Sequence, residues 1–149
     1  MGGRRARRLD DIAEALPLRA EALTRLFIAH ASVPMSTTEA GVMRALFDAP
    51  RRITELAVSQ GVTQPAITLL VNRLADRGWV ERQPDRRDAR AVLVELTPLG
   101  RQVVDQLRNE YRALVHEEMA TLPDSDVAAL ARAVEVLEQL VDRLRERLS

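Results

Sequence analysis

The sequence contains no cysteine, which excludes disulfide bonds, thiol-based redox sensing and metal sites built on thiolates. It also lacks any run of about 18 apolar residues, so no membrane-spanning helix is expected. Residues 1–8 are basic but lead into Leu9, Asp10 and Asp11 rather than into an apolar core, so no signal peptide is expected. These absences predict a cytoplasmic protein that makes no contact with a membrane.

The residues on which enzymes and metal sites depend are scarce. His30 and His116 are the only histidines, and the two glutamates that follow His116 leave a helix in other directions, so no metal-ligand spacing arises. The sequence has no glycine-rich phosphate loop and no serine placed beside a histidine base. It therefore predicts a protein that is not an enzyme and has no cofactor.

Lysine is absent as well, so all 22 basic residues are arginines, and they balance 22 acidic residues to a net charge of zero. The charge is uneven along the chain. Residues 51–90 hold eight arginines against five acids, whereas residues 101–149 hold seven arginines against ten acids. Because local charge sets the field that a phosphate backbone meets, the neutral total does not exclude DNA binding.

Residues 54–68 carry the pattern of a helix-turn-helix. Ala57 is small where two helices would cross, and Gly61 follows where the first helix must end in a left-handed conformation. Thr63 is placed to cap the second helix, and Pro65 falls in its first turn, where a missing N–H does no harm. The second helix shows apolar residues with a 3.6-residue period, namely Ile67, Leu70, Val71 and Leu74.

A two-stranded ribbon is predicted directly after this helix, which makes the fold mainly α and a winged helix-turn-helix. The strands are expected at residues 79–82 and 90–96, with the turn-rich residues 83–89 between them. Thr97 is the expected N-cap of a long helix that has Pro98 at its first position.

Three short stretches resemble the wing signature of the multiple antibiotic resistance regulator (MarR) family: RGWVER at residues 77–82, DAR at 88–90 and LTPLG at 96–100. The resemblance covers nearly the whole chain, and implies a bacterial homodimeric transcription factor. Many members of this family release DNA when a small aromatic or phenolic ligand binds. The sequence departs from the family at two positions: Ala89 stands where the family usually has Arg or Lys, and Leu69 where many members carry Arg.

The N-terminal part of the chain is expected to hold two helices. Pro17 would interrupt a helix, so the first is predicted near residues 18–31. The segment STTE at residues 36–39 is a capping box, and a second helix is predicted at about residues 37–48. Ile53 is expected to pair with the wing as a third strand of one residue.

Two long helices are predicted at residues 98–119 and 124–148. The second is about 37 Å long, which is more than a winged domain of this size can cover. Its apolar face is formed by Val127, Leu130, Ala131, Val134, Leu137, Leu140, Val141, Leu144 and Leu148. A second copy of the chain is the simplest cover for this face. The alternative is an antiparallel hairpin of the two long helices within one chain.

The predicted organisation has three parts. Residues 1–17 form a basic N-terminal arm, residues 18–33 and 101–149 form a helical dimerisation domain, and residues 34–100 form the winged helix-turn-helix.

Candidate DNA-contacting residues lie on the second helix of the helix-turn-helix and on the wing: Thr63, Gln64, Pro65, Ala66, Thr68, Asn72, Arg73, Arg86, Arg87 and Arg90. Gln and Asn side chains suit adenine, and Thr reaches phosphates or a thymine methyl. The resemblance implies that Arg90 enters the minor groove. Asp88 is expected to orient an arginine, Arg73 or Arg90, because a carboxylate repels phosphate. The alternatives to DNA contact are a side chain that only caps the helix, a side chain that only faces solvent, and wing arginines that pair with acids of the turn.

The resemblance also implies a pocket for a small aromatic, anionic effector between the dimerisation helices and the winged domain. Its candidate lining is Phe27, His30, Met35, Met43 and Tyr111. For Phe27 and Met43, plain core packing is the stronger alternative.

Two functions remain open from the sequence. The first is a sequence-specific transcriptional regulator, expected to be a repressor, that binds a pseudo-palindromic operator in double-stranded DNA as a homodimer. The second is a winged-helix module for protein–protein interaction without DNA. Leu69 and the neutral net charge favour the second, and the clustered wing arginines oppose it.

Overall fold

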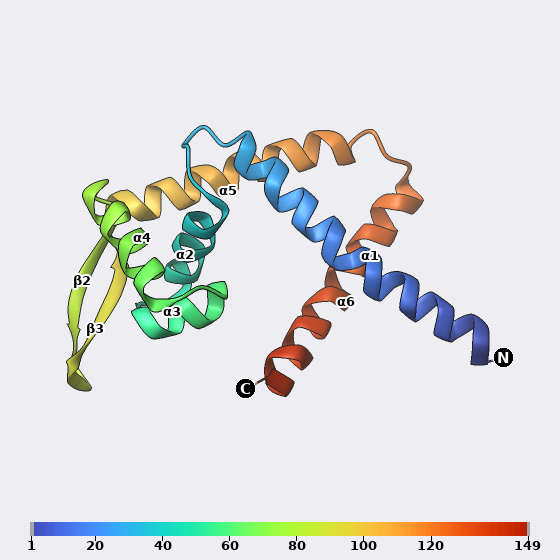
Figure 1. Ribbon diagram of the computed structural model, residues 1–149. Coiled ribbons are helices and arrows are strands. Elements are labelled where there is room, and N and C mark those ends of the chain that lie inside the picture. Colours follow the sequence, from blue (N-terminus) through green and yellow to red (C-terminus); the bar gives the residue numbers. More distant parts are fainter. Residues whose placement is uncertain (1, 149) are drawn as a thin grey trace. The chain divides into compact units, whose positions relative to one another are not determined.

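The computed structural model describes residues 2–148, which are mainly helical and include a three-stranded sheet (Figure 1). The elements follow one another as α1 (Gly2–Ala29), α2 (Thr37–Asp48), β1 (Arg51–Arg52), α3 (Ile53–Gln60), α4 (Gln64–Asp76), β2 (Val80–Asp85), β3 (Asp88–Leu96), α5 (Pro98–Met119) and α6 (Asp124–Leu148). The chain divides into two compact units, residues 1–110 and 111–149. The predicted winged helix-turn-helix fold is confirmed, and residues 34–100 are called the winged segment below.

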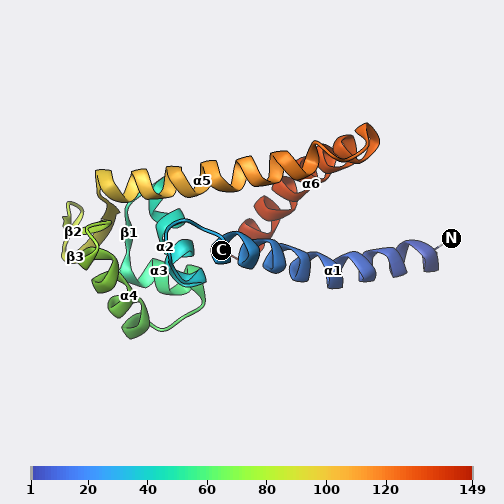
Figure 2. The ribbon, with the colours of Figure 1, turned by 90° about the horizontal axis from the view of Figure 1, so that it is seen from above.

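The core of the winged segment is built by α2, α3, α4 and the wing, and α5 contributes to it. Figures 1 and 2 show these three helices beside the sheet. The predicted apolar stripe of α4 is buried, as Ile67, Leu70, Val71 and Leu74 are at most 4% exposed. The other almost fully buried side chains are Val42, Met43, Leu46, Leu56 and Val94. Burial of this stripe decides which face of α4 points outward.

The turn between α3 and α4 has the predicted geometry. Gly61 ends α3 with φ 64° and ψ 32°, the left-handed conformation that only glycine adopts at little cost. Its N–H donates to the Val58 carbonyl at 3.2 Å, and the Val62 N–H donates to the Ala57 carbonyl at 3.1 Å. The Thr63 hydroxyl accepts a hydrogen bond from the Ala66 N–H at 3.4 Å, so Thr63 is the N-cap of α4.

The sheet has the order β1-β3-β2, and both pairs are antiparallel. The third strand is β1, in which Arg51 faces Val94 and Arg52 faces Leu93. The expectation that Ile53 would form this strand was wrong. Ile53 instead begins α3, because the Glu55 carboxylate accepts a hydrogen bond from the Arg52 N–H at 2.8 Å and so caps a helix that starts one residue later. The wing strands also continue further toward the tip than the sequence indicated.

One threonine joins the wing to α5. The Thr97 hydroxyl donates to the Gly78 carbonyl at 2.6 Å and accepts from the Gly100 N–H at 3.0 Å, so it caps α5 as predicted. The Thr97 N–H donates to the Trp79 carbonyl at 3.0 Å. Gly78 itself has φ 73°. The start of α5 is thereby fixed to the residues that connect α4 to β2.

The first helix begins much earlier than the sequence indicated. A helix start near Leu18, after an arm, was expected, but α1 spans Gly2–Ala29 with Pro17 inside it. Proline removes one backbone hydrogen bond and bends a helix. The surrounding Ala, Leu, Arg and Glu residues are strong helix formers, and the helix continues through the proline. Met1 lies outside the described residues.

The loop after α1 is held against α5 within the first unit. The Ser32 N–H donates to the Glu110 carboxylate at 3.1 Å, the Ser32 hydroxyl bonds the same carboxylate, and the Gln106 amide donates to the Ser32 hydroxyl at 2.8 Å. The hydrogen bonds from the Ser32 hydroxyl and N–H lower the pKa of Glu110.

The long terminal helices leave their apolar faces uncovered. No residue of α6 is buried, and its apolar stripe is exposed from Val127 to Leu148. On α1 the residues Leu9, Ile12 and Leu23 are more than half exposed. Within residues 2–148, no helix combines the length and the apolar character that a membrane crossing requires.

The close approach of α5 to the wing generates a prediction about Gly100. A methyl group at Gly100 would overlap the Trp79 carbonyl, a backbone group that cannot turn aside. Gly100→Ala should therefore lower the free energy of unfolding by about 1–3 kcal/mol, which is typical of overpacking. Urea denaturation followed by circular dichroism measures the change.

Gly3→Ala is the matched control, because nothing lies within 4 Å of the methyl group that it adds. Alanine favours helix over glycine, so this variant should be as stable as wild type or slightly more stable. Equal stability of the two variants would contradict the close packing at Gly100.

Candidate nucleic-acid interface

The outward face of α4 carries most of the predicted contact residues. The exposed side chains of this helix and its N-cap include Thr63, Gln64, Pro65, Ala66, Thr68, Leu69, Asn72 and Arg73. Together with Ile53 of α3, the residues Gln64, Pro65, Thr68 and Leu69 line an open groove. A helix that is anchored by one buried stripe and presents polar side chains on the other side has the form needed to enter a DNA major groove.

Three of these side chains are engaged within the protein. The Thr68 hydroxyl donates to the Gln64 carbonyl at 3.0 Å, and the Asn72 amide oxygen accepts from the Arg82 guanidinium at 2.6 Å. Arg73 lies 3.6 Å from the Glu39 carboxylate, which is 8% exposed. These contacts connect α4 to β2 and to α2. Asn72 and Arg73 must exchange these partners, or share them, in order to contact DNA.

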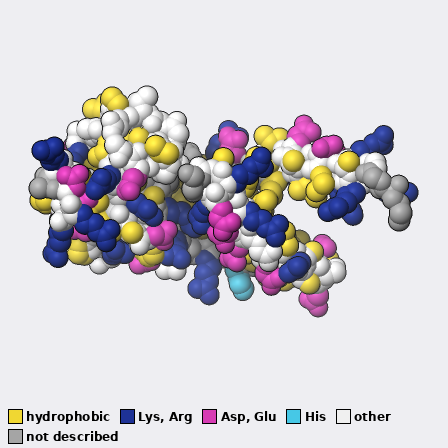
Figure 3. All heavy atoms as spheres, turned by 90° about the horizontal axis from the view of Figure 1, so that it is seen from below, with side chains coloured by type: hydrophobic (Ala, Val, Ile, Leu, Met, Phe, Trp, Pro, Cys, Tyr) yellow, Lys and Arg dark blue, Asp and Glu magenta, His cyan; other side chains and the backbone are white. Residues whose placement is uncertain are grey.

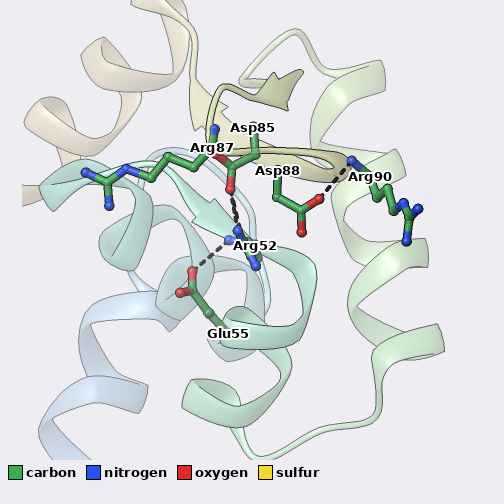
Figure 4. A network of polar contacts seen from close by, with 6 residues as sticks. All are labelled: Arg52, Glu55, Asp85, Arg87, Asp88 and Arg90. Atoms are coloured by element: carbon green, nitrogen blue, oxygen red, sulfur yellow. Dashed lines mark hydrogen bonds and ion pairs between the residues drawn. The ribbon is translucent and has the colours of Figure 1, made fainter.

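The wing tip presents three exposed arginines, Arg86, Arg87 and Arg90. Figure 4 shows the side chains of Arg87 and Arg90 extending away from the hairpin in different directions. Asp88 accepts a hydrogen bond from the Arg90 N–H at 3.1 Å, so its carboxylate orders the backbone of the tip at Arg90. That it orients an arginine side chain stays a prediction. The side chain of Ala89 lies outside the described residues.

A second carboxylate, which sequence reasoning did not single out, ties the tip end of the wing to β1 (Figure 4). Asp85 is 8% exposed and accepts from the Arg52 guanidinium at 2.6 and 3.1 Å. Its other oxygen accepts from the Arg87 N–H at 2.9 Å. The ion pair joins β1 to the end of β2, beside the irregular register at Pro84 and Asp85.

The charges of this pair shift their pKa values in opposite directions. The hydrogen bond from the Arg87 N–H, followed by that from Arg52, lowers the pKa of the Asp85 carboxyl. The hydrogen bond and the charge of Asp85 raise the pKa of Arg52. Both groups therefore stay ionised at neutral pH, and the position of the wing tip depends on a charged contact.

The candidate pocket residues have different environments. Met43 is 1% exposed and packs in the core, which agrees with the alternative of plain core packing. His30 is exposed, and its Nδ1 lies 2.9 Å from the Leu26 carbonyl oxygen. Phe27 and Met35 are half-buried in the first unit, and Tyr111 is half-buried in the second. The effector pocket therefore stays a prediction.

The fold and this surface define a winged helix-turn-helix protein. Residues 34–91 match the sequence model described as the MarR family. A crystal structure of a MarR mutant from E. coli superimposes with a TM-score of 0.74 at 26% identity, covering 85% of this chain and 95% of that chain. Over residues 34–91 the chain is therefore similar to the MarR family of helix-turn-helix transcriptional regulators, and it shares the fold of the E. coli MarR structure.

Two relatives illustrate how far the sequence similarity extends. An HTH-type transcriptional regulator of Mycobacterium bovis is 34% identical over 87 residues, which are 58% of this chain and 61% of that protein. The multiple antibiotic resistance protein MarR of Salmonella typhimurium is 36% identical over 77 residues, 51% of this chain and 54% of that protein. The chain thus spans about three fifths of the first relative's length and about half of the second's.

The ion pair of Arg52 and Asp85 generates a prediction about pH. Asp85→Asn should lower the free energy of unfolding at neutral pH, because it removes the carboxylate that Arg52 and Arg87 contact. Since the folded-state pKa is lowered, the stabilisation is fully present above the ordinary aspartate pKa of about 3.9. It is lost as the pH falls through the lower folded-state value. The difference between wild type and variant should be constant near neutrality and shrink in acid, as urea denaturation at several pH values measures.

Asp88→Asn is the matched control, because Asp88 is exposed and its hydrogen bond comes from a backbone N–H. Its effect should be smaller than that of Asp85→Asn at every pH. An Asp85→Asn variant that unfolds like wild type at neutral pH would show that the ion pair does not stabilise the wing.

Proposed function

We propose that this protein is a sequence-specific DNA-binding transcriptional repressor that acts as a homodimer on a pseudo-palindromic operator. The observation that carries the proposal is the geometry of the winged segment. The apolar stripe of α4 is buried, the opposite face is exposed, and exposed arginines stand at the wing tip. Similarity to the structure of the multiple antibiotic resistance repressor MarR supports repression as the direction of control.

The distribution of charge supports DNA as the partner. Residues 51–90 hold three more arginines than acids, although the whole chain is neutral. Figure 3 shows basic side chains over the visible face of the winged segment, with acidic ones between them. Two acids of the winged segment, Asp85 and Glu39, are held in ion pairs with Arg52 and Arg73. The wing-tip arginines are left to meet phosphates or the minor groove.

The uncovered apolar faces support the homodimer. The stripe on α6 extends over most of a 25-residue helix, and from Val127 to Leu144 its exposed valines and leucines are 39–56% exposed in the single chain. Apolar surface of this extent is usually covered by a partner. A two-fold axis would place two copies of α4 about one DNA turn apart and would match a pseudo-palindromic site.

The second candidate is a protein–protein interaction module without DNA. Leu69, which is 63% exposed on α4, is the observation that favours it. A gel-shift experiment with genomic fragments at low salt separates the two functions, since the interaction module would retard no fragment.

Release of DNA by a small aromatic, anionic effector is a further part of the proposal. Only Thr97 separates β3 from α5, so a displacement of α5 must move the wing. An effector would act only if it bound the two arrangements with different affinity. Thermal shift and gel-shift experiments against a panel of phenolic acids test this part.

Two variants of the proposed interface should change DNA binding in different ways. Arg90→Ala should weaken binding to all sequences and reduce the slope of log K against log salt by about one, because one phosphate contact is lost. Gln64→Ala should alter the preference at one base position, at a cost of about 1–3 kcal/mol if the contact is bidentate. Fluorescence anisotropy with the operator across a salt series measures both.

Arg132→Ala is the control for Arg90, because Arg132 is an exposed arginine of α6 that pairs with Glu135 at 2.7 Å. It should leave the salt slope unchanged. If Arg90→Ala follows the wild-type curve across the series, the assignment of Arg90 to the DNA surface is wrong.

The dimer is tested by charge in the α6 stripe. Light scattering of the wild type at micromolar concentration should give about twice 16.7 kDa. Aspartates at Leu137 and Leu144 together should give a monomer, because burying two charges in an apolar interface is costly. Neither residue is buried in the single chain, so the variant should keep its helical circular dichroism signal.

Gln139→Asp adds a charge on the opposite side of α6 and should remain dimeric. A wild type of 16.7 kDa at this concentration would exclude the proposed dimer.

A further inference from the structure

Leu69 is an apolar side chain at the centre of the outward face of α4. It is 63% exposed, although the helix starts at Gln64 and buries its stripe on the other side. Pro65 lies four residues earlier, so the two side chains share one face of the helix. Both line the groove beside Ile53.

Single exposed leucines are common on protein surfaces, so exposure alone does not indicate a function for Leu69. The position of Leu69 is what matters. Polar residues adjoin it on the helix, with Thr68 beside it and Asn72 one turn away, and both are exposed. Arg73 follows Leu69 by four residues, so it lies on the same side of the helix, and it too is exposed. An apolar pair enclosed by hydrogen-bonding and basic side chains does not fit a lipid surface. Two residues are also too few for a stable protein interface, which needs about 800 Å² from each partner.

A helix that enters the major groove must desolvate the side chains at its centre. A leucine there forms no hydrogen bond with a base edge or a phosphate, so its burial is favourable only against an apolar group. The major groove offers one such group, the 5-methyl of thymine.

We infer that Leu69, supported by Pro65, reads a thymine 5-methyl group in each half-site, and that it is a specificity-determining residue of this protein. The inference rests on the proposed DNA binding and adds the base and the atom that are recognised.

The experiment first selects an operator from a random double-stranded DNA library with the full-length wild-type protein. Each thymine of the selected site is then replaced in turn by deoxyuridine, which removes the methyl group and keeps all hydrogen bonds. At one thymine in each half-site, wild type should bind about fourfold more weakly per methyl lost, as expected for burial of one methyl group.

Leu69→Ala should bind the unmodified operator more weakly than wild type and should no longer distinguish uracil from thymine at that position. The variant is expected to fold, since Leu69 is exposed and alanine is the strongest helix former. Val58→Ala is the matched control, because Val58 is 83% exposed on α3 and lies in a neighbouring groove with Thr54, Glu55 and Ser59. It should keep the wild-type response to uracil.

The outcomes separate the inference from the function on which it rests. If no site is selected and no DNA is bound at low salt, the proposed function fails, and the inference fails with it. If a site is selected but uracil is bound as well as thymine at every position, only the inference is overturned. The same holds if Leu69→Ala keeps the full response to uracil.

Discussion

The hydroxyl of Thr97 is the contact on which the arrangement of the winged segment depends. It bonds the carbonyl of Gly78, two residues after the end of α4, and it caps α5 through Gly100. The backbone of Thr97 and that of Trp79 are hydrogen bonded as well. The connection between α4 and β2 and the start of α5 therefore meet at one point, joined by hydrogen bonds of the Thr97 side chain and backbone. Under the proposed regulation, a displacement of α5 would pass to the wing through these hydrogen bonds.

The arginines of the winged segment divide into two groups by their contacts. Arg52 is held by Asp85, Arg82 bonds Asn72, and Arg77 stacks on Trp79 at 4.7 Å from the ring centroid. These side chains stabilise the wing and its attachment to α4. The arginines of the wing tip extend outward instead (Figure 4). The excess of basic residues in this part of the chain thus overstates the charge that is available to a phosphate backbone.

The local features of the fold could be predicted from the sequence. The capping box at Ser36, the turn at Gly61 and the cap at Thr97 each depend on neighbouring residues, and all three are confirmed. The similarity to the MarR family, too, followed from short motifs around the wing. The ion pair of Arg52 and Asp85 could not be predicted, because it joins residues 33 apart that become neighbours only when β1 and β2 both pair with β3. The only signal was an acid within an arginine-rich tip.

The expected start of α1 was wrong because one proline does not outweigh its surroundings. The helix-forming residues on both sides of Pro17 have a summed propensity that favours one continuous helix. The residues of the proposed interface could be predicted from the sequence only in part. Periodicity identified which residues of α4 face outward, and the structure agrees. Which of those side chains are held by neighbours, as Asn72 and Arg73 are, depends on packing between elements that are distant in sequence.

Charge segregation along the chain gives a neutral protein a preferred orientation toward DNA. Residues 51–90 carry a surplus of three positive charges, and residues 101–149 carry a surplus of three negative charges. At zero net charge the long-range attraction of the whole molecule for a polyanion is weak, and the difference between its parts decides how it approaches. Under the proposed function, the phosphate backbone attracts the winged segment and repels residues 101–149, so encounters through the acidic residues are short-lived. At physiological salt the Debye length is about 8 Å, so this selection acts only at close range. Non-specific binding should consequently be weak, and the proposed specificity depends on the few exposed side chains of α4.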